Sequence, residues 1–225
     1  MKIKYLALPV FAGLLINNVY AADASLNSDK KKMSYAIGMQ FGKDFKRSGM
    51  DIDVNTFTKA IKDILGGKQP ALNQEEVQQA LNMLREQQMK AQKNIANENK
   101  KKGEAFLAAN KNKKGVIELP SGVQYLVLKE GTGKIPTKAN SVVAHYEGRL
   151  IDGTVFDSSI QRGKPATFPV TGVIKGWQEV LQKMKVGSKW QVYIPSSLAY
   201  GQRGTGPIIG PNATLIFDIE LIEIK

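Results

Sequence analysis

The sequence predicts an α+β protein in which an all-α N-terminal part and a long connecting helix precede a bent antiparallel sheet packed on one short helix. Two changes of pattern along the chain lead to this prediction. Up to about residue 114 the apolar residues recur at helical spacing, whereas from about Val116 they alternate with polar residues as in strands. Within the second part, only a segment near Trp177 returns to helical spacing. A helix layered against an antiparallel sheet buries the apolar face of both.

Residues 1–21 have the pattern of a secretory signal peptide. Lys2 and Lys4 precede an apolar run over residues 6–16, which is too short to span a bilayer as a helix, and Ala21 ends the segment. The alternative is a buried N-terminal helix. No cysteine follows the apolar run, which excludes lipid attachment there. We therefore expect an exported, soluble chain with no transmembrane segment once the signal is cleaved.

The chain has no cysteine and a single histidine, His145. This composition excludes disulfides, a thiol nucleophile, Cys- or His-based metal sites and a His-dependent nucleophilic triad. We expect no metal and no cofactor. His145 stands beside Tyr146 in a strand pattern, which favours a strand residue that faces away from any apolar pocket.

The formal net charge is +12, and much of the excess lies between Lys93 and Lys114. Such a run usually forms the solvated face of a helix. We expect no nucleic-acid partner, because an exported chain rarely meets nucleic acid and no stacking platform of aromatic residues accompanies the lysines. Weak attraction to anionic membrane surfaces or acidic proteins is compatible with this charge.

Residues 22–72 are expected to form a small helical module. A first helix over residues 29–48 carries one apolar stripe and ends at Gly49, and a second begins near Val54 and ends at Gly66-Gly67. Two short helices bury little apolar surface by themselves. We therefore predict a homodimer formed through these helices. The first stripe consists of Met33, Ile37, Phe41 and Phe45, and the second of Phe57, Ile61, Ile64 and Leu65.

Residues 73–114 are predicted to form the connecting helix. Asn73 and Glu76 have the spacing of a capping box, and neither Gly nor Pro follows until Gly103. The apolar stripe thins after Leu84, so the second half is expected to bury little and to act as a stalk through solvent. The alternative is a third helix folded back on a compact bundle.

Residues 115–225 are predicted to form the sheet domain. Strands are expected over residues 123–127, 142–146, 149–151, 189–194 and 214–224. Asp152-Gly153 between two strand patterns indicates a hairpin. The helix begins near Trp177, which starts an i, i+3, i+4, i+7 stripe with Val180, Leu181 and Met184, and Gly187 ends it.

Four blocks and a closing strand in this domain follow one another in an order that resembles the FKBP-type peptidyl-prolyl isomerases. The resemblance covers residues from about 115 to 225, and it implies a half-barrel sheet and catalysis of X-Pro isomerisation. A signal peptide, a Met-containing helical module and a long helix before such a domain also resemble the Mip proteins of bacterial envelopes. That resemblance implies a dimer in the periplasm or at the outer membrane or cell surface. The four blocks are residues 142–148, 153–159, 173–177 and 198–201, and the closing strand is residues 213–221.

The activity implied needs a dry apolar pocket rather than a nucleophile or a base. The barrier to rotation, about 18–20 kcal/mol, reflects the double-bond character of the C–N bond, which the twisted amide loses. An apolar pocket favours that twisted, less dipolar amide over the planar form that water stabilises.

The resemblance assigns residues of this chain to that pocket. Trp177 is expected to form its floor, Tyr200 to place a hydroxyl near the substrate carbonyl, and the Ile174 N–H to donate to ligand. Asp157 is expected at the pocket edge, with Arg162 orienting it. Taken singly, Val173, Phe217 and Trp177 would be core residues more often than ligand contacts. Asp157-Ser158 alone would indicate a turn or a helix cap. The remaining predicted contacts are the walls Tyr146, Phe156, Val173 and Phe217, Phe168 beside them, and Ile208 and Ile209 on a loop leaning over the pocket.

Two departures from the family pattern concern ligand preference. Ala166 stands where many members have an aromatic residue, so that this pocket wall is expected to be either lower or rebuilt by Phe168. The loop over residues 202–212 lacks a histidine found in some relatives and differs in length from compact members. The affinity for macrolides such as FK506 or rapamycin, and the preference for the residue before proline, are therefore left open.

The expected partners are unfolded or proline-containing exported proteins, whose folding the isomerase would accelerate. The alternative is a dimeric chaperone or surface adhesin that binds clients between its two arms, with isomerase activity secondary. The long helix and the apolar N-terminal module favour this alternative, because catalysis alone needs neither. The sequence leaves open the clients, the choice between periplasm and surface, and whether the dimer is obligatory.

Overall fold

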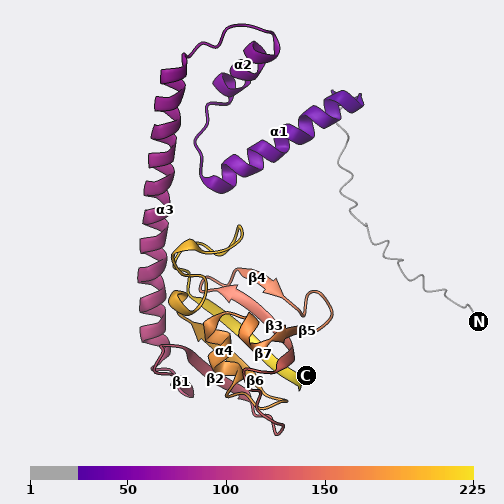
Figure 1. Ribbon diagram of the computed structural model, residues 1–225, viewed down its shortest axis with the longest axis vertical. Helices are drawn as coiled ribbons and strands as arrows, with labels where there is room; N and C mark the ends of the chain where they lie inside the picture. Colours follow the sequence, from indigo (N-terminus) through magenta and orange to yellow (C-terminus); the bar gives the residue numbers. More distant parts are fainter. Residues whose placement is uncertain (1–24) are drawn as a thin grey trace, which may run out of the picture. The chain divides into compact units, whose positions relative to one another are not determined.

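The computed structural model describes residues 25–225, so the predicted signal peptide at 1–21 lies outside the described residues (Figure 1). The chain divides between Gln69 and Pro70 into two compact units, which are described here one at a time. Within the described range, no helix has both the length and the apolar character needed to cross a membrane.

The N-terminal unit contains helices α1 (Asp29–Ser48) and α2 (Val54–Leu65). Ser28 caps α1 by accepting from the Lys31 N–H at 3.3 Å, and Gly49 ends this helix with φ of 65°. Asp53 caps α2 by accepting from the Thr56 N–H at 2.6 Å. Both helices therefore begin and end where the sequence predicts.

Three phenylalanines form the apolar contact of this unit. The Phe45 and Phe57 rings meet edge to face with centroids 5.4 Å apart, and Phe41 lies 6.0 Å from Phe45 and 6.1 Å from Phe57. No residue of α2 is buried, while Met33 and Ile37 on α1 are 61% and 59% exposed. The apolar stripes that predicted these helices are thus largely uncovered in the single chain.

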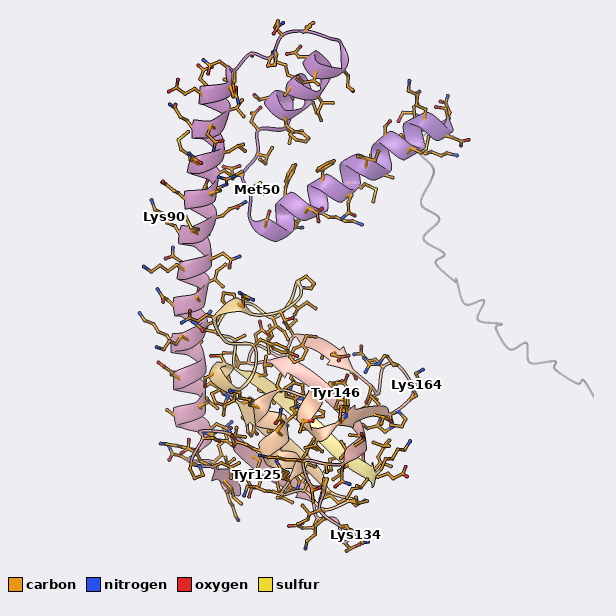
Figure 2. The ribbon with its side chains drawn as sticks, in the orientation of Figure 1. Met50, Lys90, Tyr125, Lys134, Tyr146 and Lys164 are labelled. Atoms are coloured by element: carbon orange, nitrogen blue, oxygen red, sulfur yellow. The ribbon has the colours of Figure 1, made fainter. Side chains whose placement is uncertain are left out.

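The second unit begins with α3 (Gln74–Asn110), whose 37 residues make it about three times the usual helix length. The predicted capping box is present: Asn73 Oδ1 accepts from the Glu76 N–H at 3.0 Å, and Glu76 Oε2 accepts from the Asn73 N–H at 2.8 Å. Side chains along the first half, among them Lys90, project away from the helix (Figure 2).

The second half of α3 is exposed along most of its length, as expected, but several of its residues pack on the sheet domain. Gly103 and Asn110 are buried, and the Phe106 ring lies 5.9 Å from the Tyr193 ring of the sheet domain. A Cβ on Gly103 would come within 2.2 Å of Thr214 Oγ1, so the backbones approach closely at this point. The two buried residues are a glycine and an asparagine, and a search for apolar spacing does not register either.

The sheet has seven antiparallel strands in the order β1-β2-β6-β7-β3-β4, with β5 also paired to β3 (Figure 1). The predicted strands 142–146 and 149–151 are one continuous strand, β3. Its alternation breaks at Gly148, where the register with β4 shifts, and for this reason the pattern resembled two strands. The strands are β1 (Val116–Glu118), β2 (Gln124–Lys129), β3 (Ser141–Leu150), β4 (Val155–Ser158), β5 (Ala166–Pro169), β6 (Lys189–Ile194) and β7 (Leu215–Ile224).

Helix α4 (Lys175–Leu181) lies against this sheet and completes its core. Gly176 brings the helix close, since a Cβ there would come within 2.5 Å of Ile194 Cγ2. Val180, Leu181 and Met184 are fully buried, although the helix ends at Leu181, before the last residue of the predicted stripe. The α+β architecture predicted from the sequence is therefore correct.

Candidate functional site

A cavity of about 500 Å³ opens in the sheet domain between α4, the sheet and the loop before β7. Every site residue predicted from the sequence lines it except Arg162. Four further lining residues were not predicted: Gly172, Thr205, Gly206 and Pro207. The lining residues that were predicted are Tyr146, Phe156, Asp157, Phe168, Val173, Ile174, Trp177, Tyr200, Ile208, Ile209 and Phe217.

Trp177, in the first turn of α4, lies at the centre of an aromatic cluster and is only 3% exposed. Its ring meets Tyr146 at 5.4 Å, Phe217 at 5.3 Å and Phe168 at 5.7 Å between centroids, with planes 76–86° apart. These edge-to-face contacts fix the indole from three sides. The indole N–H is buried and has no hydrogen-bond partner among the described residues.

The walls depend on two small residues of the sheet. A Cβ on Gly148 would come within 2.5 Å of the Phe156 ring and 2.7 Å of the Phe217 ring, so only glycine leaves room for their contact. Ala166 packs on the core without lining the cavity, whereas Phe168 lines it and contacts both Tyr146 and Trp177. Phe168 thus supplies an aromatic wall on this side.

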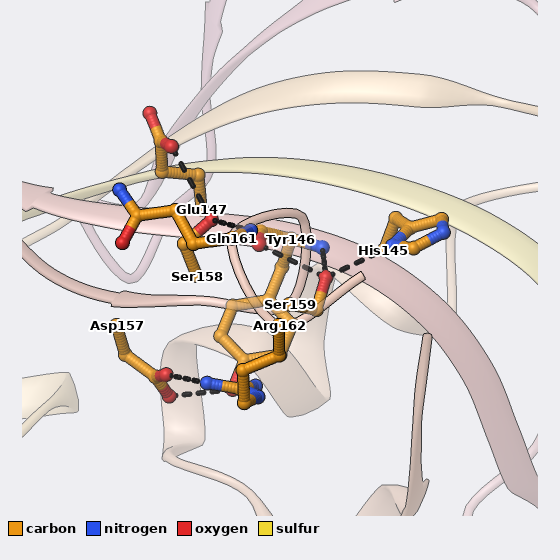
Figure 3. Close-up of polar contacts among 8 residues, drawn as sticks. All are labelled: His145, Tyr146, Glu147, Asp157, Ser158, Ser159, Gln161 and Arg162. Atoms are coloured by element: carbon orange, nitrogen blue, oxygen red, sulfur yellow. Dashed lines mark hydrogen bonds and ion pairs between the residues drawn. The ribbon is translucent and has the colours of Figure 1, made fainter. Parts of the chain in front are cut away.

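Asp157, Tyr146 and Arg162 form a closed polar triangle at the cavity edge (Figure 3). The Tyr146 hydroxyl donates to Asp157 Oδ2 at 2.5 Å, and Arg162 donates to Asp157 Oδ1 and, at 2.8 Å, to the Tyr146 hydroxyl. The guanidinium also lies 5.5 Å from the Tyr146 ring centroid. Arg162 therefore acts on the cavity through the two side chains that line it.

The triangle changes the acidity of its members. Partial burial would raise the pKa of Asp157, but the hydrogen bonds from Tyr146 and Arg162 outweigh it and hold that pKa below its usual value. Burial, reinforced by the bond to Asp157, raises the pKa of Tyr146. At neutral pH the edge thus holds a carboxylate, a neutral phenol and a guanidinium.

Ser159, which the sequence analysis did not single out, fixes the turn that carries Arg162 (Figure 3). Its hydroxyl is fully buried, accepts from the Tyr146 N–H at 2.7 Å and lies 3.1 Å from the Tyr146 carbonyl. His145 Nδ1 lies 3.0 Å from the same hydroxyl, and His145 does not line the cavity, as predicted. The small polar residues after Asp157 signal a turn, but nothing in the sequence shows which neighbours they hold.

Two hydrogen-bond donors on residues that line the cavity have no partner among the described residues. One is the Tyr200 hydroxyl, on a side chain 39% exposed, whose pKa is raised by burial and by the charge of Asp157. The other is the Ile174 N–H, just before α4. The Val173 and Ile174 carbonyls at the same point do have partners, because they accept from the Gln178 side chain and backbone N–H respectively. Such donors suit a ligand carbonyl entering an otherwise apolar space.

The loop before β7 closes one side of the cavity. The Thr205 N–H donates to the Ile209 carbonyl at 2.8 Å, which folds the loop back on itself. Ile209 is buried in the core cluster and Ile208 stays accessible, although both line the cavity. Among the described residues, no group of three or more His, Asp or Glu side chains is placed to hold a metal ion.

Two family profiles match the chain. Residues 133–222 match the FKBP-type peptidyl-prolyl cis-trans isomerase family, and residues 30–127 match the domain amino terminal to FKBP-type peptidyl-prolyl isomerase. The first match contains the whole cavity, and the second contains all of α1 except its first residue and the whole of α2 and α3.

Similar proteins match over nearly their full length. The chain is 46% identical to the outer membrane protein MIP of Legionella longbeachae over 100% of this chain and 99% of the relative. It is 44% identical to the peptidyl-prolyl cis-trans isomerase Mip of Coxiella burnetii over 99% of both chains. The crystal structure of FkpA from Escherichia coli superposes with a TM-score of 0.67 at 33% identity, covering 88% of this chain and 98% of that one.

Proposed function

The chain belongs to the FKBP-type peptidyl-prolyl cis-trans isomerases, and we propose that the X-Pro bond of a peptide substrate rotates in the cavity above Trp177. The observation that carries this assignment is an aromatic-lined space of about 500 Å³ with two unpaired donors at its wall. A space of that size suits a proline ring with its flanking residues. The rings around Trp177 would hold the pyrrolidine by contact area and exclude water.

Exclusion of water lowers the barrier to rotation about the X-Pro bond because it destabilises the planar amide, which is the ground state. The planar amide is more dipolar than the twisted one, so transfer from water to an apolar cavity disfavours the planar form more. Interactions that grow stronger as the bond twists raise the rate, whereas those equal in both states raise only affinity. Rotation breaks no bond, so the mechanism needs neither proton transfer nor a covalent intermediate.

The donors give the substrate its orientation. We assign the Ile174 N–H to a substrate carbonyl on the far side of the proline, and the Tyr200 hydroxyl to the carbonyl of the rotating amide. Asp157, kept ionised by Arg162 and Tyr146, presents a fixed negative charge at the edge of the same cavity. In a site of low dielectric such a charge acts strongly on an amide whose dipole changes during rotation.

We place the protein in a bacterial envelope, where it would accelerate the folding of exported proteins. The predicted signal peptide supports export, and the name of the Legionella relative places that protein in the outer membrane. X-Pro exchange takes tens to hundreds of seconds without catalysis, which is slow enough to limit folding.

The uncovered stripes of α1 and α2 support a homodimer through these helices. Apolar side chains as exposed as Met33 and Ile37, in contiguous stripes, mark an interaction surface in a water-soluble protein. A dimer would give each client two linked cavities. The same observation also favours a second function, in which the paired arms hold an unfolded client as a chaperone does.

Substitution at the cavity edge tests the isomerase site. We expect Tyr200→Phe and Asp157→Leu to lower kcat/KM on a proline tetrapeptide by at least about tenfold, equal to about 1.4 kcal/mol of transition-state stabilisation. Tyr125→Phe is the matched control, because Tyr125 stacks on Trp190 at 4.3 Å and does not line the cavity. Wild-type rates in both cavity variants would remove these residues from the site.

A further inference from the structure

The loop over residues 201–212, named here the cavity loop, is bound to the long helix by two reciprocal hydrogen bonds. Asn99 Nδ2 on α3 donates to the Pro211 carbonyl at 2.9 Å. Asn212 Nδ2 on the loop donates to the Ala96 carbonyl of α3 at 3.2 Å. Both bonds are partly buried, and each joins a side-chain amide of one segment to the backbone of the other.

The backbone of the cavity loop is shaped for this contact. Asn212 has φ of 56°, the only positive φ at a non-glycine position in the described range, and its N–H donates to the Gly201 carbonyl at 2.8 Å. That bond closes the base of the loop. A Cβ on Gly210 would come within 3.2 Å of Asn99 Nδ2, so glycine lets the loop lie close to the helix.

The same loop carries Ile208 and Ile209 into the cavity and begins directly after Tyr200. Three of its residues are glycines in the left-handed region, which leaves the free loop many conformations. Fixing it costs conformational entropy, and contacts outside the loop must offset that cost. Two amide hydrogen bonds to a rigid helix supply such contacts on the side away from the cavity.

We propose that Asn99 and Asn212 are positioning residues of the isomerase, which fix the cavity loop on α3 and thereby hold Ile208 and Ile209 against the bound peptide. The proposal rests on the cavity being the isomerase site. The second half of α3 then supports the substrate site by holding its loop in place, in addition to linking the two parts of the chain. Asn99 and Asn212 touch no substrate themselves, since neither lines the cavity.

The test compares Asn99→Asp with Asn97→Asp in the full-length protein. The first exchanges the amide donor for a carboxylate of the same shape, and the second makes the same charge change at an exposed position two residues earlier. Loss of a hydrogen bond that positions the loop is expected to raise KM for a chromogenic proline tetrapeptide about five- to tenfold in Asn99→Asp, with kcat within about twofold. Asn97→Asp is expected to match the wild type.

Hydrogen exchange of the cavity loop provides the readout that does not depend on activity. Amides over residues 201–212 are expected to exchange faster in Asn99→Asp than in Asn97→Asp, while those of β3 and β7 stay unchanged. Asn212→Gly should have the same effects, because glycine keeps the positive φ and removes only the amide donor. This second variant decides the matter if Asn99→Asp does not fold.

Equal KM and equal exchange in the two helix variants would overturn the proposal. A lower melting temperature with unchanged KM would also overturn it, because it would make Asn99 a purely structural residue. If the wild type itself lacked isomerase activity, the proposed function would fail, and the exchange measurement would still decide whether α3 holds the loop.

Discussion

The two units of this protein differ in how far they bury their apolar side chains. The sheet domain encloses Trp177, Val180 and Leu181 almost completely and lines a cavity with aromatic rings. The N-terminal unit buries no residue of α2 and leaves Met33 and Ile37 more than half exposed. The first is complete as a single chain, whereas the second presents a surface that water disfavours. The difference supports the proposal that the isomerase reaction takes place in the sheet domain and that the N-terminal helices pair with a second copy.

The largest expected effect comes from removing the centre of the enclosed unit. Trp177→Ala should cost about 3–5 kcal/mol of unfolding free energy, as for other buried aromatic residues. It should also abolish isomerase activity, because three rings lose their common contact. Urea unfolding followed beside a peptide assay measures both. A variant that melts like the wild type and still binds a proline peptide would show that Trp177 is not the floor.

Trp190 separates damage to the fold from damage to the site. Both tryptophans are buried, and neither indole N–H has a hydrogen-bond partner within residues 25–225, but Trp190 stacks on Tyr125 and does not line the cavity. Trp177→Phe and Trp190→Phe should therefore lose similar stability, and only the first should lose most of its activity. Equal loss of activity in both would mean that the rate simply follows stability.

The next largest effect concerns the uncovered unit. The double substitution Met33→Glu and Ile37→Glu should convert a dimer to a monomer, halving the mass measured by light scattering at micromolar concentration. Charges are strongly disfavoured where apolar side chains would otherwise meet. Helix content should not change, because both side chains are exposed in the single chain. A wild type that is already monomeric would defeat the dimer proposal.

Activity then distinguishes the roles of the two units. The monomeric variant should isomerise a short peptide at close to the wild-type rate, since the cavity lies wholly in the second unit. Its effect on the refolding of a whole protein should fall, because linking two sites raises the effective concentration of the second. Removal of residues 22–69 should give the same pattern. An unchanged refolding rate would contradict the role of a dimer in handling clients.

Sequence patterns predicted the helices and the sheet because these elements repeat a contact at fixed spacing. They failed where a single contact joins distant residues. The hydrogen bond from Asn99 to the Pro211 carbonyl joins residues 112 positions apart, and no periodic pattern in the sequence predicts it. Gly148 similarly appeared as a break between two strands, whereas it makes room for Phe156 in one strand. The site residues came from resemblance to a family, and their roles stay predictions.

A smaller effect is expected from the buried hydroxyl behind the cavity edge. Ser159→Ala would leave the Tyr146 N–H without its acceptor, and an unpaired buried donor costs about 1–3 kcal/mol. Activity should fall severalfold, because the turn that carries Arg162 loosens. His145→Ala is the control, since Ser159 keeps both contacts to the Tyr146 backbone without it. If the two substitutions lowered stability and activity equally, Ser159 would not be the residue that holds the turn carrying Arg162.

The smallest expected effect is a dependence on pH carried by Asp157. Its pKa in the folded protein lies below the unfolded value of about 4, so the ionised carboxylate stabilises the fold above that value. This contribution is lost as the pH falls through the folded pKa, which places the loss below about pH 4. Because Asp157 and Arg162 are both nearly half exposed, solvent screening limits it to at most about 1 kcal/mol.

Tryptophan fluorescence isolates this effect, because Trp177 and Trp190 both lie in the sheet domain and are the only tryptophans of the chain. Urea midpoints should differ between the wild type and Asp157→Asn at pH 7, and the difference should narrow progressively as the pH falls below about 4. Far-UV circular dichroism also records the N-terminal helices, where the caps and ion pairs of Asp53 and Asp63 lower their own pKa values. Those groups titrate alike in both proteins, so a gap that does not narrow as the pH falls below about 4 would show that Asp157 acts through something other than its charge.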